Sequence, residues 1–193
     1  MRWVKYKQVI ENFFSLSILN ALNVLLPLVT LPYMLHVVGK ANYGAYSYVY
    51  AVVQYVILFS TYGFNFSATK QISQCRDDKE KVSKIYNAVT ASKTLIALSL
   101  SVLLLLCAKL VFKDGVGTLM FVYGLGMVIG DVLTPIWLFQ GMEKMKYMTI
   151  VNASSKILFT ILIFIVVRAS DDYQLLILLN SCGYLLAGVL SLI

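Results

Sequence analysis

The sequence predicts an all-α integral membrane protein, a bundle of six transmembrane helices. Hydrophobic residues make up 60% of its 193 residues and charged residues only 13%, with a mean hydropathy of +0.80. Soluble domains contain about 25% charged residues, so this composition argues against a soluble domain. A series of long apolar segments supports the same class, because about 20 such residues cross a hydrocarbon core about 30 Å thick.

The expected spans cover most of the chain, and short polar turns separate all but one pair of them. They lie at about residues 13–38, 43–66, 85–112, 117–141, 148–168 and 173–193. The longer segment 67–84 joins the second span to the third and mixes acidic with basic side chains. We expect it to form an amphipathic link on the cytoplasmic side.

The first span combines a polar stripe with two prolines. At about 100° per residue, Asn20, Asn23 and Pro27 fall on one face. Amide groups without partners are costly in hydrocarbon, so this face should meet other helices or water. Pro27 and Pro32 each remove a backbone donor, which makes them candidate hinges.

Similar stripes run along the other five spans. The polar residues that we assign to a common substrate cavity are Asn20, Asn23, Gln54, Thr61, Asn87, Lys93, Thr94, Asn152, Lys156 and Asn180. In the fourth span, Gly126 and Gly130 form a GxxxG pair that lets a neighbouring helix approach closely. Polar residues that only join helices would also produce stripes, so a dry, packed bundle stays open as the alternative.

Three charged residues are expected within the membrane, where each costs about 2.5–3.5 kcal/mol on an insertion scale. They are Lys93, Asp131 and Lys156. The lysines either face the cavity or extend to the inner interface. Asp131 is too short to reach the interface and is a candidate for ion coupling, while a salt bridge to Lys93 or Lys156 is the structural alternative.

Basic residues predict a cytoplasmic N-terminus, because they favour the inner side of the membrane. The expected inner segments contain Arg2, Lys5, Lys7, Lys70, Arg76, Lys79, Lys81, Lys84, Lys144 and Lys146. The outer turns contain Lys40, Lys109, Lys113 and Arg168. The net charge of +7 is therefore attributed to inner loops and not to nucleic-acid binding.

No motif in the sequence indicates catalysis. The loops are short, and there is no glycine-rich nucleotide loop, no His/Cys cluster with metal-ligand spacing and no carboxylate pair at a shared cleft. Cys75, Cys107 and Cys182 are scattered, without the spacing of a zinc site or disulfide framework. We therefore expect a protein that is not an enzyme, with no catalytic residues, no cofactor and no metal.

Two motifs resemble the bacterial polysaccharide-biosynthesis transporters, the Wzx-type O-antigen and capsule flippases of the MOP superfamily. The first runs through Pro32-Tyr33, Tyr43-Gly44 and Tyr62-Gly63-Phe64, and the second is the PxWxxQGxE pattern of residues 135–143. The resemblance covers essentially the whole chain. It implies a MATE/MOP-like N-terminal lobe of six helices at residues 1–193, followed in the complete protein by a second lobe. Because the sequence stops at Ile193 within the sixth span, we expect it to be truncated.

The resemblance also implies a function and a location. A family member would move an oligosaccharide linked to undecaprenyl diphosphate across the bacterial inner membrane by alternating access. Its partners would be this lipid-linked oligosaccharide, membrane lipids and other polysaccharide-assembly proteins. The alternatives are a MATE-like cation-coupled exporter, which needs an acidic cavity, a membrane-embedded polysaccharide-assembly enzyme, which needs a catalytic loop, and a scaffold that transports nothing.

Overall fold

The computed structural model describes residues 2–111 and 116–192, and every regular element within them is helical. Its elements are α1 Arg2–Val37, α2 Gly39–Thr61, α3 Phe64–Gln74, α4 Lys79–Val111, α5 Val116–Leu133, α6 Ile136–Gly141, α7 Met145–Val166, the 3₁₀ turn η1 Ser170–Asp172 and α8 Tyr173–Leu190. Among the described residues, six helical segments are long and apolar enough to cross a membrane. The prediction of an all-α membrane bundle is confirmed.

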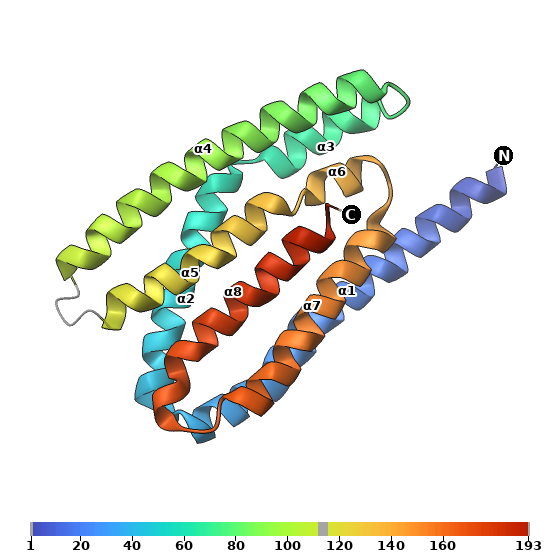
Figure 1. Ribbon diagram of the computed structural model, residues 1–193. Coiled ribbons are helices and arrows are strands. Elements are labelled where there is room, and N and C mark those ends of the chain that lie inside the picture. The colour runs from blue at the N-terminus through green and yellow to red at the C-terminus, as the bar shows by residue number, and fades with distance from the viewer. Residues whose placement is uncertain (1, 112–115, 193) are drawn as a thin grey trace.

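The six segments are Phe13–Val37, Gly39–Gln74, Lys79–Leu110, Gly117–Gly141, Met145–Val166 and Ser170–Leu190. Each contains most of one range expected from the sequence. The expected ends at residues 112 and 193 lie outside the described residues. Figure 1 shows the α1–α2 turn and the α7–α8 connection at one end of the bundle, with α6 and the α3–α4 turn at the other.

The linking segment 67–84 is more helical than its charged composition suggests. Tyr62 and Gly63 have positive φ angles of 33° and 76°, which break the helix between α2 and α3. After the next turn, α4 begins at Lys79, where the backbone N–H of Lys81 donates to the Asp78 carboxylate (3.1 Å), an N-cap interaction. Hydrogen bonds from the Lys81 backbone and side chain lower the pKa of Asp78 below its usual value.

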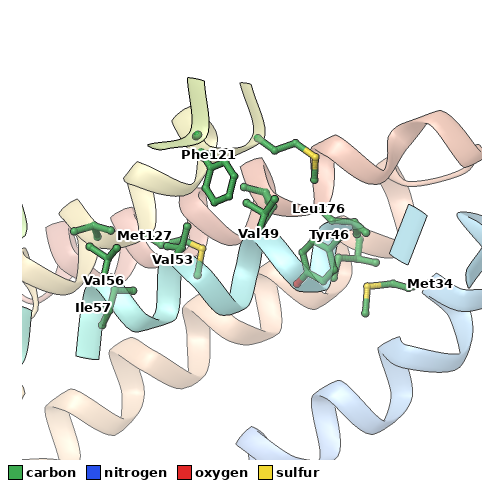
Figure 2. Packing of buried hydrophobic residues seen from close by; sticks show 14 of the residues in the cluster. Met34, Tyr46, Val49, Val53, Val56, Ile57, Phe121, Met127 and Leu176 are labelled. Carbon is green, nitrogen blue, oxygen red and sulfur yellow. The ribbon is translucent and has the colours of Figure 1, made fainter. Parts of the chain in front are cut away.

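The main core lies where α2, α5 and α8 meet. Val53, Met127 and Leu176 are fully buried there, and Figure 2 shows valines of α2 facing Phe121 and Met127 of α5. Many large apolar side chains on the outside of α1 and α4 are exposed, including Leu28 and Leu98. That distribution suits helices whose outer faces meet lipid.

A second, smaller cluster fastens α3 to α6. Ala68 and Ile72 pack against Trp137, and the Thr69 hydroxyl donates to the Trp137 carbonyl (3.2 Å). Gly141 is required here, because a Cβ at this position would lie 2.7 Å from the Ile72 Cβ. The PxWxxQGxE pattern therefore has a packing role: it holds the short helix α6 against α3.

Candidate functional site

A cavity of about 330 Å³ lies between α1, α7 and α8, and the end of α5 and Tyr50 of α2 complete its wall. Its volume is at the lower end of the range of small-molecule sites, about 300–1,000 Å³. The polar lining residues are Asn23, Thr30, Tyr50, Asp131, Thr134, Asn152, Ser155, Lys156, Thr160, Asn180 and Tyr184. Apolar neighbours such as Leu22 and Phe159 separate them. The site is therefore amphipathic, with polar groups on α1, α2, α5, α7 and α8.

Lys156 contributes a cation to this lining. It is on α7, and its ammonium donates a hydrogen bond to the Asn23 side-chain oxygen of α1. The amide therefore fixes the lysine without cancelling its charge, because Asn carries none. The ammonium remains able to attract an anionic group.

Asp131 contributes the anion, and it is paired. Its Oδ2 lies 2.8 Å from the Lys93 Nζ, and the same ammonium donates to the Asp131 backbone carbonyl (2.8 Å). Although Oδ2 is at ion-pair distance, it accepts no hydrogen bond with good geometry. The structural alternative considered for Asp131, a salt bridge, is present, and Lys93 is the partner.

A network of phenols and amides supports the α2 and α8 side of the cavity, where Asn180 and Tyr184 line the wall and Gln54 and Tyr46 lie behind it. The Gln54 amide donates to the Tyr184 hydroxyl (3.0 Å), and the Asn180 amide donates to the Tyr46 hydroxyl (2.7 Å). These bonds occupy amide donors while leaving carbonyl oxygens as acceptors. The wall therefore presents oxygen and hydroxyl groups, which suit a ligand rich in hydroxyls.

The structure places four of the ten predicted cavity residues in the cavity wall, together with the ion-coupling candidate Asp131. Asn23, Asn152, Lys156, Asn180 and Asp131 line the cavity, as does the predicted hinge residue Pro27. Two others act from behind it, Gln54 through Tyr184 and Lys93 through Asp131.

The remaining predicted residues lie elsewhere. They are Asn20, Thr61, Asn87, Thr94 and the second hinge candidate Pro32, and none of these lines the cavity. Hydroxyls on such residues bond to their own helix, as Thr94 does to the Thr90 carbonyl (2.7 Å). α1 continues as one helix through both prolines. A polar stripe shows that a helix has a distinct face but does not identify what that face meets.

Sequence reasoning did not select several lining residues, notably Ser155, Tyr184, Thr134 and Thr160. Ser155 and Tyr184 lie on the same polar stripes as Asn152 and Asn180, although they were not chosen as cavity residues. Ser155 is only 4% exposed, and its hydroxyl has no hydrogen-bond partner. Within residues 2–111 and 116–192, no three His, Cys, Asp or Glu side chains are placed to hold a metal ion.

Comparisons with known proteins identify the family of this chain. The family model described as "Polysaccharide biosynthesis protein" matches residues 9–193. A protein of Escherichia coli (strain K12) named "Putative O-antigen transporter" is 33% identical over 182 residues, which are 94% of this chain and 44% of that protein. A protein of the same name from Shigella dysenteriae is 28% identical over 183 residues, 94% of this chain and 46% of that protein.

The chain thus spans about half the length of the curated relatives that it matches. No solved structure matches it. The relatives are named as transporters, in agreement with the expectation of a protein that is not an enzyme. The resemblance noted in the sequence is confirmed: this chain is a multi-pass membrane protein and belongs to the polysaccharide biosynthesis protein family.

Proposed function

We propose that this chain is one helical lobe of a flippase for a lipid-linked, diphosphate-bearing oligosaccharide. The observation that carries the proposal is Lys156, a cation fixed by a neutral amide in the wall of a polar cavity between membrane helices. The family and the names of the two relatives support a polysaccharide or O-antigen substrate. In this proposal the inner bacterial membrane is the site of action, with the N-terminus in the cytoplasm.

The chemistry of the cavity suits such a substrate. A diphosphate is anionic and accepts hydrogen bonds from an ammonium group, and charged hydrogen bonds contribute about 1.5–3 kcal/mol. Sugar hydroxyls both donate and accept, so the amides and hydroxyls of Asn152, Asn180 and Tyr184 are suitable partners. The lipid tail would stay in the membrane, beside the exposed apolar faces of the bundle.

Transport would require the rest of the protein. In the proposed mechanism a second lobe faces this one, and rocking of the lobes exposes the substrate alternately to the two sides. Pro27 and Pro32 are proposed as points at which α1 bends during this motion, because each lacks a backbone donor. A cation exporter would need an acidic cavity, whereas the acid that lines this one is already paired with Lys93.

The proposal is tested by transport in vesicles that contain the full-length protein and a fluorescent polyprenyl-diphosphate oligosaccharide. A membrane-impermeant glycosidase, which cleaves the sugar only in the leaflet that it can reach, is used to monitor movement between leaflets. We expect Lys156→Met to lower the transport rate by at least tenfold, which corresponds to about 1.4 kcal/mol.

Lys109→Met is the matched control, since Lys109 is exposed near the end of α4 and does not line the cavity. It should transport at the wild-type rate. Absence of transport by the wild-type protein would contradict the proposed function, and equal rates in the Lys156 variant and the control would contradict the assigned role of the cavity.

A further inference from the structure

We propose that Lys93 determines the charge preference of the cavity without contacting the ligand. By pairing with Asp131, Lys93 neutralises the negative charge of a carboxylate that would otherwise repel an anion. The net charge at the site is then set by Lys156. The inference deepens the proposed function and rests on it for the identity of the transported substrate. The test of the charge itself does not require transport.

The geometry separates the two lysines. Lys93 is on α4, is only 4% exposed and is absent from the cavity lining. Asp131 is on α5, lines the cavity and has a side chain that is 18% exposed. The carboxylate therefore has one side toward Lys93 and another toward the cavity, and a ligand would meet Asp131 but not its partner.

Lys93 contacts a second negatively polarised group besides the Asp131 carboxylate. Its ammonium also donates to the Asp131 backbone carbonyl, in the last turn of α5, which ends at Leu133. Carbonyl groups at a helix C-terminus carry partial negative charge, equivalent to about half an elementary charge. One buried ammonium thus contacts both sources of negative potential at this wall of the cavity.

The consequence follows from the charges around Asp131. The other charged or titratable side chains that share the cavity with it are Lys156 on α7, Tyr184 on α8 and Tyr50 on α2. With Lys93 present, the pair is neutral and Lys156 leaves the site positive. Without Lys93, an ionised Asp131 would cancel the charge of Lys156, and the preference for an anion would disappear.

The test measures the potential in the cavity directly. In the full-length protein all native cysteines, Cys75, Cys107 and Cys182 among them, are replaced by alanine, and Asn152→Cys places a reporter thiol in the cavity lining. Its rates of reaction with an anionic and a cationic methanethiosulfonate of similar size are compared at pH 8. The ratio of the two rates reports the local potential, since a change of one charge acts on the two reagents in opposite directions.

We expect Lys93→Met to lower the anionic-to-cationic rate ratio by about sixfold or more, because one charge at a distance on the order of 8 Å changes each rate about 2.4-fold at the dielectric constant of water and more in a less polar cavity. Asp131→Asn should raise the ratio, and the double variant should return to the wild-type value. Lys93→Arg keeps the positive charge and should also have the wild-type ratio. If Lys93 acted only in packing, the ratio would not depend on the charge at position 93.

Lys109→Met serves as the matched control on α4, with an unchanged ratio expected. The proposal is overturned if Lys93→Met leaves the ratio unchanged, or if the double variant has the ratio of either single variant. Where Lys93→Met fails to fold, Asp131→Asn and the double variant still decide it. Wild-type vesicles that transport no oligosaccharide would contradict the proposed function while leaving this charge test intact.

Discussion

Ser155 shows at the scale of one residue how a polar group can be buried without a partner. Its side chain lies in the wall of the cavity, yet its hydroxyl is buried and makes no hydrogen bond. A buried polar group without a partner costs about 1–3 kcal/mol. Ser155→Ala should therefore raise the free energy of unfolding by about 1 kcal/mol, measured by thermal unfolding of the full-length protein in detergent.

The adjacent serine provides the control for this prediction. Ser154 is exposed, and its hydroxyl donates to the Ile150 and Val151 carbonyls of its own helix (2.8 and 3.0 Å). Ser154→Ala should change the stability by less than about 0.5 kcal/mol, as for most surface substitutions. A loss of stability in Ser155→Ala would show that the hydroxyl has a partner, such as an ordered water, in the folded protein.

At the scale of elements, the contact between α5 and α8 depends on small residues. A Cβ on Gly130 would meet backbone atoms of Tyr184 and Leu185, far inside normal contact distance. Backbone cannot rotate away as a side chain can, so Gly130→Ala should force α5 and α8 apart. We expect destabilisation by about 3 kcal/mol or more, at the upper end of overpacking effects, with a loss of folded protein measured by size-exclusion chromatography in detergent.

Alanine substitutions at two other glycines serve as comparisons for this prediction. A Cβ on Gly124 would lie 2.6 Å from a methyl group of Val53, a side chain that can move, so Gly124→Ala should cost less than Gly130→Ala. Gly44 is in helix α2 with nothing within 4 Å of the added Cβ, and alanine there should be neutral or stabilising by up to about 1 kcal/mol. Equal yields for Gly130→Ala and Gly44→Ala would contradict the tight contact between α5 and α8.

The same elements show what the sequence could and could not predict. The length of the apolar runs indicated all six spans, and the GxxxG pair indicated the close approach at Gly130. The helix α3 was harder to find, because its polar composition resembles a solvated link. Its burial depends on Ile72 packing against Trp137, which is distant in the sequence. Contacts of this kind follow from tertiary structure and are not encoded in local periodicity.

For the molecule as a whole, the sequence indicated the chemistry of the candidate site better than it indicated which residues line the cavity. Stripes on α1, α7 and α8 contain Asn23, Lys156 and Asn180, which line the cavity because these three helices surround it. The stripe on α4 is similar in sequence, but Thr94 is exposed outside the cavity. The rotation of each helix within the bundle decides which stripe faces the cavity, and that rotation depends on the packing of all neighbours.

This difference gives a prediction for the water-accessible path through the molecule. In the full-length protein, with its native cysteines replaced, Asn23→Cys and Asn152→Cys should react with a membrane-impermeant thiol reagent, because both positions line the cavity. Thr94→Cys should stay as unreactive as Leu98→Cys, an exposed apolar position on the same helix. Reaction at Thr94 but not at Leu98 would show that the polar stripe of α4 also meets water, and the path would then extend beyond this cavity. Absence of reaction at both cavity positions would leave Lys156 inaccessible from water, which is incompatible with its proposed contact with a diphosphate that enters from the cytoplasm.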